Sequence, residues 1–200
     1  MQRAFIAFVL ATFALLAGAV VYFYQATVEI AQPVVSVEAA TPEIVQYPTF
    51  TMNDIDGNPR DFIEWDGRHR LLNFWATWCA PCRREIPLLK EFQAEQGDGG
   101  ILIMGIAVDY PEEVTAFAEA AEFNYPILVG QEDAMELAES SGIQFIAMPF
   151  TMFVSRNGEL MGAYLGELHR SHLDTISDLL GQLDNGEIDT EQAKEALALL

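Results

Sequence analysis

The stretch that decides the fold of this 200-residue chain reads LLNFWATWCAPCRREIP, residues 71–87. It opens as a continuous apolar run, which is typical of a central strand buried on both faces. It then passes through Pro81 into a segment whose apolar residues are spaced for a helix. The only two cysteines of the chain, Cys79 and Cys82, lie at this strand-to-helix junction.

Two cysteines three residues apart at the start of a helix can close a small disulfide ring. The free amide groups of the first turn favour a thiolate at Cys79, and Cys82 lies one turn in, where it can attack a mixed disulfide. A purely structural disulfide is the alternative, but so small a ring stabilises little. A metal site would need two more ligands at suitable spacing, and the sequence has none. The pair therefore predicts a redox site, not a metal site.

Elements on both sides of this junction extend the alternation of strands and helices. Before it, short strands are predicted at Phe50–Met52 and Asp61–Ile63, joined by the turn Asp56-Gly57-Asn58. After it, the predictions in chain order are a strand at 101–108, a helix from Pro111, a strand at 127–129, a helix at 134–139, a hairpin at 150–154 and 159–165, a helix at 171–183 and a last helix capped by Thr190. This order predicts an α/β fold with a central mixed sheet flanked by helices and an extra N-terminal β-hairpin.

The amino-terminal segment differs from the rest, because residues 4–24 carry no charge. A helix of that length rises about 30 Å, which matches the hydrocarbon core of a bilayer. A cleaved signal peptide is the alternative, with Ala17-Gly18-Ala19 as its cleavage site. An uncleaved anchor is favoured because the apolar run continues to Tyr24 through aromatic residues that suit a membrane interface. Arg3 then orients the remainder of the chain outside the cytoplasm.

Charge and composition divide the chain in the same place. Hydrophobic residues make up 51% of it, yet its formal net charge is −20, and every acidic residue lies at Glu29 or later. Such a surface repels phosphate, so it excludes charge-driven binding to nucleic acid. We expect an anchor at 1–24, a linker at 25–46, a domain at 47–184 and a helical extension at 185–200.

Residues 74–87 resemble the active-site segment of thioredoxin-like proteins, and most closely that of membrane-anchored, periplasm-facing thiol-disulfide reductases of the TlpA/ResA type. The resemblance extends to Met148-Pro149-Phe150-Thr151, which is placed like the cis-proline loop of that family. It covers roughly residues 47–180. It implies a thioredoxin-like fold and a redox-active Cys79–Cys82 disulfide with no other cofactor.

The resemblance also implies how the cysteines share the work. Cys79 is the nucleophile and Cys82 resolves the mixed disulfide. Thioredoxins carry a buried Asp where this chain has Asn73, and an Asn cannot shuttle a proton. We therefore assign proton management for Cys82 to Glu85, which lies one helical turn further along, where partial burial would raise its pKa. A plain solvated helix glutamate is the alternative.

Five further residues complete the predicted site. Trp78 is expected to flank the sulfurs as an apolar lid or to serve in ordinary packing. Pro149 is predicted cis, which presents the Met148 backbone to an extended substrate that adds as a strand. Ala80 and Pro81 keep charge out of the loop and tune the reduction potential.

The remaining basic candidates are interpreted as surface residues. His69, His169 and His172 are expected to be solvated, and none is assigned to a metal. Arg83 and Arg84 are expected on a solvated helix face.

Together these features predict a thiol-disulfide oxidoreductase held at the inner membrane with its catalytic domain in the periplasm. By resemblance, it would reduce disulfides of exported proteins, for example during cytochrome c maturation, with electrons from a membrane-embedded dithiol carrier. A thiol-dependent peroxidase and a metal chaperone on the same fold are the alternatives. The WCxPC arrangement counts against the first, and the lack of a positioned His counts against the second.

Overall fold

The computed structural model describes residues 49–200 of the chain. The predicted anchor and linker, residues 1–46, lie outside the described residues. Within residues 49–200, no helix combines the length and the apolar composition needed to cross a membrane.

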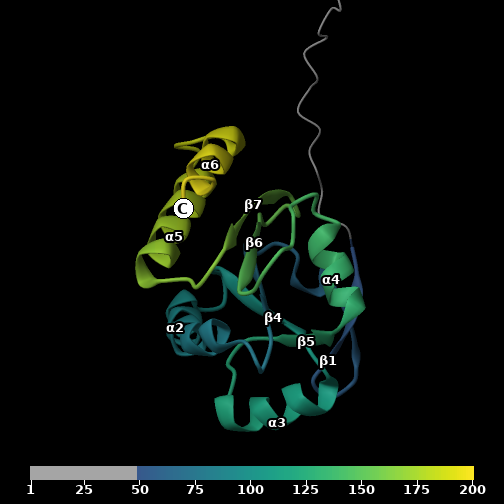
Figure 1. Ribbon diagram of the computed structural model, residues 1–200. Coiled ribbons are helices and arrows are strands. Elements are labelled where there is room, and N and C mark those ends of the chain that lie inside the picture. Colours follow the sequence, from purple (N-terminus) through teal and green to yellow (C-terminus); the bar gives the residue numbers. More distant parts are fainter. Residues whose placement is uncertain (1–48) are drawn as a thin grey trace, which may run out of the picture. The chain divides into compact units, whose positions relative to one another are not determined.

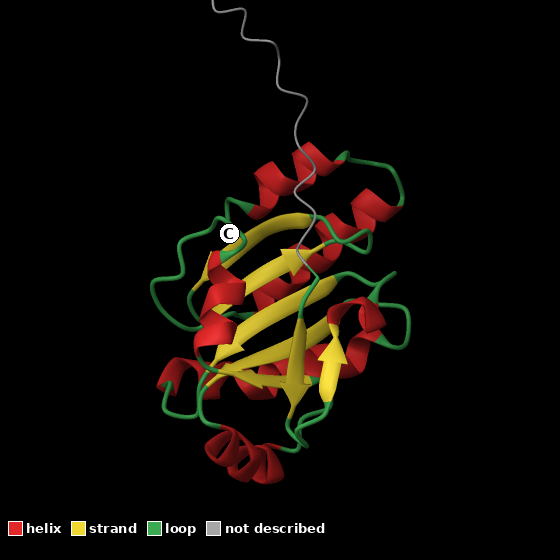
Figure 2. Cartoon of the chain, turned by 90° about the vertical axis from the view of Figure 1, so that its right-hand side faces the viewer, coloured by secondary structure: helices red, strands yellow, loops and turns green. Residues whose placement is uncertain are grey.

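Seven strands of the described part form one mixed sheet, in the order β2-β1-β5-β4-β3-β6-β7. The central strands β3, β4 and β5 run parallel, whereas β1, β2, β6 and β7 pair antiparallel at the two edges. Figure 2 shows the strands side by side with helices on both faces of the sheet. Their bounds are β1 (Thr51–Asp54), β2 (Pro59–Asp61), β3 (Arg70–Trp75), β4 (Leu102–Val108), β5 (Ile127–Gly130), β6 (Phe150–Val154) and β7 (Leu160–Leu165).

Helices cover both faces of this sheet, as the sequence predicts. Helices α2, α5 and α6 lie on one side and α4 on the other (Figure 1). The alternation along β3 explains why two cores form, because Leu71 and Trp75 face the first core while Leu72 and Phe74 face the second. The helices are α2 (Ala80–Gln96), α3 (Pro111–Ala121), α4 (Glu132–Glu139), α5 (Arg170–Asp184) and α6 (Thr190–Leu197), with a 3₁₀ turn η1 (Phe62–Trp65).

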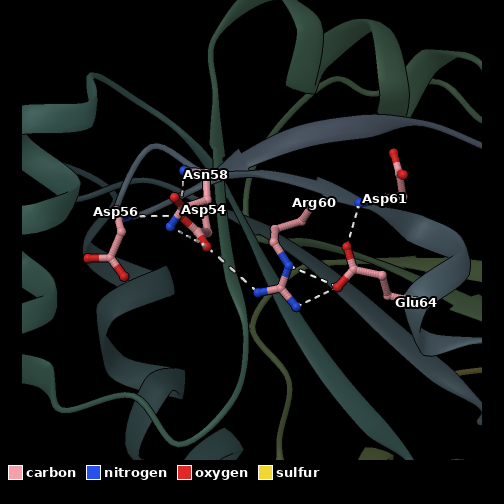
Figure 3. Close-up of polar contacts among 6 residues, drawn as sticks. All are labelled: Asp54, Asp56, Asn58, Arg60, Asp61 and Glu64. Carbon is pink, nitrogen blue, oxygen red and sulfur yellow. Dashed lines mark hydrogen bonds and ion pairs between the residues drawn. The ribbon is translucent and has the colours of Figure 1, made fainter.

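The N-terminal hairpin forms, but the predicted bounds of its second strand are wrong. That strand ends at Asp61, and residues 62–65 turn into η1. Figure 3 shows the cause: the Glu64 carboxylate accepts hydrogen bonds from the Asp61 backbone N–H at 2.9 Å and from Arg60 Nε at 2.9 Å. With these contacts the chain turns at residues 62–65 and Phe62 packs against Phe50, so the apolar pair at 62–63 does not continue a strand.

The turn of the same hairpin lies where the sequence predicts it. The Asp54 carboxylate accepts hydrogen bonds from the backbone N–H groups of Asp56 at 3.0 Å and of Asn58 at 2.9 Å (Figure 3). An Asp side chain that bonds the backbone further along is a common way to fix a turn. Gly57 takes the positive φ of 81° that the turn requires.

The last helix begins one residue earlier than predicted, at Thr190, because its cap is Asp189 and not Thr190. The Asp189 carboxylate accepts from the Gln192 N–H, and the Gln192 side chain accepts from the Asp189 N–H, each at 2.9 Å. This reciprocal pair satisfies two amides of the first turn, which a Thr one position later cannot do. Helix α6 packs on β7, and Lys194 Nζ donates to Glu159, the residue before β7, at 2.7 Å.

Candidate active site

The two cysteines form a disulfide at the junction between β3 and α2. Their Cα atoms are 5.3 Å apart. Cys79 is the N-cap residue of α2, with extended backbone, and its Sγ accepts a hydrogen bond from the Cys82 N–H at 3.3 Å. Pro81 sits in the first turn, where its missing N–H costs nothing. Cys82 is wholly buried, so only Cys79 presents surface to a partner.

A carboxylate that the sequence reasoning missed fixes the loop leading into Cys79. Asp109 follows β4, and its Oδ2 accepts from the Thr77 N–H at 2.9 Å and from Thr77 Oγ1 at 2.6 Å. Its Oδ1 accepts from the Tyr110 N–H at 2.8 Å. Because β3 and β4 are parallel neighbours, their carboxyl ends meet. An acidic residue directly after the second buried strand was the available signal for this contact.

Glu85 is the one charged side chain of α2 that the fold buries, with an exposed fraction of 1%. Its Oε1 accepts from the Asn73 side-chain amide at 2.8 Å, and its Oε2 accepts from the Leu168 backbone N–H at 2.7 Å. Burial raises the pKa of Glu85 to about 7, although both hydrogen bonds act to lower it. The predicted burial and the predicted direction of the shift are therefore present in the structure.

The position of Glu85 brings a titratable group near neutrality into the surroundings of the disulfide. Glu85 lies three residues after Cys82 on α2, and residues at that spacing are neighbours on a helix surface. A carboxyl group whose pKa lies near the working pH can both accept and return a proton. The charge of Glu85 also acts on Tyr125. The pKa of the Tyr125 phenol is raised mainly by burial and secondly by that charge.

Asn73 lies next to Glu85 as an uncharged partner. Its amide donates both to Glu85 and to Thr151 Oγ1, the latter at 3.0 Å. Thr151 lies directly opposite Asn73 in the β3–β6 pairing. Asn73 therefore ties the carboxyl group to the strand that follows the proline loop without adding a second proton site.

The Met148–Pro149 peptide bond is cis, as predicted. Antiparallel pairing sets Phe150 against Phe74, so Pro149 lies at the end of β3 from which the chain continues to Cys79. Met148 is half-buried and packs against the core cluster that contains both cysteines. The proline loop and the disulfide therefore lie at the same edge of the sheet.

Three side chains close to the cysteines in sequence, those of Trp78, Arg83 and Arg84, are exposed but differ in their contacts. Trp78 is 68% exposed, which contradicts ordinary packing and leaves its indole at the surface beside Cys79. Arg83 and Arg84 lie on the exposed side of α2, as expected. Arg84 is also engaged, because its Nε donates to Glu167 Oε2 at 3.0 Å.

The interpretation of His69 as a solvated surface residue is wrong. Its exposed fraction is 4%, its Nε2 lies 2.9 Å from Asp184 Oδ1, and its Nδ1 accepts from the Arg156 N–H at 3.2 Å. The hairpin turn between β6 and β7 and the end of α5 enclose it. His169 is exposed and His172 is half-buried. Across residues 49–200, no group of three or more His, Cys, Asp and Glu side chains is arranged to hold a metal ion.

Comparison with known protein sequences agrees with this geometry. The chain matches the AhpC/TSA family over residues 45–163. It is 30% identical over 134 residues to the thiol-disulfide oxidoreductase ResA of Geobacillus thermodenitrificans, covering 64% of this chain and 75% of that protein. It is 26% identical over 148 residues to the thioredoxin-like protein YneN of Bacillus subtilis, covering 71% and 82%.

Solved structures share the fold. A thiol:disulfide interchange protein of the thioredoxin family from Chlorobium tepidum aligns with a TM-score of 0.61 at 24% identity, over 68% of this chain and 94% of that one. The exposed lipoprotein thioredoxin Etrx1 of Streptococcus pneumoniae aligns with a TM-score of 0.57 at 22% identity, over 68% and 100%. The predicted thioredoxin-like fold, a central mixed sheet flanked by helices, is confirmed.

Proposed function

Because this chain belongs to the AhpC/TSA family and is a thiol-disulfide oxidoreductase of the thioredoxin-like, ResA type, we propose that it reduces disulfides of exported proteins from a membrane tether. The observation that carries the proposal is the asymmetry of the disulfide. Cys79 keeps a small exposed fraction of 6%, whereas Cys82 has none and lies on α2 three residues before the buried, protonatable Glu85. Such a pair favours exchange with a partner through Cys79.

The proposed reaction starts from the dithiol form of the protein. The Cys79 thiolate attacks one sulfur of the substrate disulfide, that S–S bond breaks, and the other substrate sulfur leaves as a thiolate. Cys82 then attacks Cys79 Sγ, which closes the Cys79–Cys82 disulfide and releases the second substrate sulfur. Two electrons pass from the protein to the substrate, and a membrane-embedded dithiol donor would restore the dithiol.

Glu85 is proposed to accept the proton that Cys82 must lose before it attacks. Its pKa of about 7 lies close to that of a thiol, so the transfer has a small driving force in either direction. The Asn73 amide and the Leu168 N–H donate to the carboxylate before the transfer and keep the carboxyl group in place. When the donor reduces the disulfide, the same carboxyl group would return the proton to Cys82.

The substrate is proposed to bind as an extended segment beside the cis Met148–Pro149 bond. Backbone groups next to such a bond can add a strand, and the exposed Trp78, which directly precedes Cys79, offers apolar surface. Ala80 and Pro81 keep charged side chains out of the loop and would tune the reduction potential.

An extracytoplasmic position for this domain is supported by the uncharged segment at residues 4–24. A domain on that side of the membrane meets oxidised cysteine pairs of exported proteins. Haem-attachment cysteines of apocytochrome c are the proposed example, since they must be reduced before haem is joined to them.

The direction of electron flow is tested by the midpoint potential, measured against a glutathione or dithiothreitol buffer. We expect a midpoint potential close to that of thioredoxin, about −270 mV. A potential close to that of DsbA, about −120 mV, would show that the protein is an oxidase and not a reductase.

The roles of the two cysteines are tested with a synthetic peptide that carries an oxidised CxxCH pair. The variant Cys82→Ser should accumulate a mixed disulfide through Cys79, visible by mass spectrometry as the sum of protein and peptide. Cys79→Ser is the matched control and should trap none. Trapping by Cys79→Ser in place of Cys82→Ser would reverse the assigned roles.

A further inference from the structure

Residues 166–168, between β7 and α5, contact three separate parts of the site. The Gly166 N–H donates to the Pro149 carbonyl at 2.9 Å. The Glu167 carboxylate accepts from Arg84 Nε at 3.0 Å and from Arg84 Nη2 at 2.5 Å. The Leu168 N–H donates to Glu85 Oε2 at 2.7 Å. One short segment thus joins the proline loop, the surface of α2 and the buried carboxyl group.

The last two of these contacts are made by neighbouring residues on both sides. Arg84 and Glu85 are successive residues of α2, and Glu167 and Leu168 are successive residues of the segment. The outer pair is ionic and accessible, with exposed fractions of 61% for the Arg84 side chain and 23% for that of Glu167. The inner pair is a buried hydrogen bond to a carboxyl oxygen. An exposed ion pair therefore joins the residues that directly precede Glu85 and Leu168, the two partners of the buried hydrogen bond.

We propose that Arg84 and Glu167 are positioning residues, whose ion pair holds the Leu168 N–H on Glu85 Oε2 and so controls, from the surface, the proton exchange of Glu85. Neither side chain touches the sulfurs, so both act through the 166–168 segment. The consequence for Cys82 rests on the proposed function, whereas the effect on Glu85 itself does not.

A positioning role and a purely electrostatic role of Glu167 predict opposite changes in the pKa of Glu85 when Glu167 is neutralised. The charge of Glu167 raises the pKa of Glu85, while the Leu168 N–H lowers it. If Glu167 acts only as a charge, its neutralisation lowers the pKa of Glu85. If it acts by holding the segment, its neutralisation frees the Leu168 N–H and raises that pKa. The other side chains that interact with Glu85, Asn73 and Tyr125, are neutral, as are Thr151, which accepts from Asn73, and the closed Cys79–Cys82 pair one turn earlier on α2.

The test is a titration of the Glu85 carboxyl carbon by ¹³C NMR, in the full-length, disulfide-bonded protein. The signal is identified by its absence in Glu85→Gln. In Glu167→Gln we expect the pKa of Glu85 to rise by about half a unit, because an exposed ion pair can transmit only a modest coupling. An unchanged or lowered pKa would overturn the proposal.

The chain offers a matched control in another exposed ion pair of α2, which joins this helix to α5. Arg170 donates to Glu95 at 2.8 and 2.7 Å, and this pair lies three helical turns away from Glu85 along α2. Glu95→Gln should leave the Glu85 titration unchanged. An equal shift in Glu95→Gln would mean that any loosening of the α2–α5 contact suffices, and would also overturn the proposal.

The same variants separate this inference from the proposed function. The carboxyl titration uses no substrate and no thiol, so it stands even if the protein is not a reductase. If Glu167→Gln shifts the titration and also shifts the pH profile of disulfide exchange with the oxidised peptide, both proposals are supported. If the titration shifts while the wild-type protein fails to reduce the peptide, only the proposed function fails.

Discussion

Two polar clusters lie along β3, and they differ in whether a buried ionisable group has a partner of opposite charge. Further along the strand, the carboxylate cluster consists of Asn73, Glu85, Thr151 and the Leu168 backbone, and it surrounds one acidic group with neutral partners. At the start of the strand, the ion-pair cluster consists of Asp66, His69, Arg70, Arg156 and Asp184, and it gives each buried basic group a carboxylate. Arg70 Nη1 donates to Asp66 at 2.7 Å, and His69 Nε2 lies 2.9 Å from Asp184.

The difference separates a group placed to exchange a proton from groups placed to hold structure. Without a counter-ion, burial moves the pKa of Glu85 to about 7, within reach of a thiol. In the ion-pair cluster, burial lowers the pKa of His69, which favours the neutral ring as a hydrogen-bonding partner of Asp184. Arg70 remains a cation and lies over the Phe62 ring at 4.2 Å. Only the carboxylate cluster is built to titrate during a reaction.

The largest expected effect comes from adding a charge to the carboxylate cluster by Asn73→Asp. Two carboxyl groups would then face each other across a 2.8 Å contact, and both cannot ionise. At pH 8 we expect the free energy of unfolding to fall by about 4 kcal/mol, as for an uncompensated buried charge. At pH 5 the loss should be smaller, because the pair can share a proton. Urea unfolding at both pH values measures this, and equal losses would contradict the like-charge explanation.

The next effect is the pH dependence that Glu85 imposes on stability. Its pKa is raised from 4.5 to about 7 on folding, so its contribution is fully present below pH 4.5 and is lost as the pH rises through 7. Relative to Glu85→Gln, the wild-type protein should lose on the order of 3 kcal/mol of unfolding free energy between pH 4.5 and 8. Denaturant titrations of the disulfide-bonded proteins over this range measure the difference. Parallel curves for the two proteins would show that Glu85 is not the titrating group.

The carboxylate cluster could be predicted from the sequence because most of its signals are local. Cys82 and Glu85 share one helical turn, and Asn73 lies within the buried strand that leads to them. The cis bond at Pro149 also followed from a short motif. The Leu168 N–H could not be foreseen, because a backbone group carries no residue signature and this one lies 83 positions from Glu85.

The ion-pair cluster escaped prediction for the same physical reason. His69 follows Arg68 and precedes Arg70, which is the pattern of a polar, solvated strand start. Its burial depends on Arg156, 87 positions away, and on Asp184, 115 positions away. Asp109 is similar, since it holds Thr77 from 32 positions away. Local periodicity describes which face of an element is apolar, but not which distant polar group satisfies a buried one.

The smallest expected effect tests whether the two clusters are independent. His69→Gln removes ring hydrogen bonds to Asp184 and to the Arg156 backbone, so it should cost about 1 kcal/mol of unfolding free energy at pH 7.5. Since burial lowers the pKa of His69, its contribution is fully present above pH 6.5 and is lost as the pH falls through the folded value. The unfolding free energy of the variant should therefore fall less steeply than that of the wild-type protein as the pH is lowered below 6.5.

The slope from His69 is opposite in sign to the slope from Glu85, so denaturant titrations across pH 5 to 8 separate the two groups. The pH profile of disulfide exchange should stay at its wild-type position in His69→Gln, because within residues 49–200 no side-chain hydrogen bond or ion pair joins the ion-pair cluster to the carboxylate cluster. A profile that moves as it does in Glu85→Gln would show that β3 couples its two ends, and the division between a structural and a reactive cluster would no longer hold.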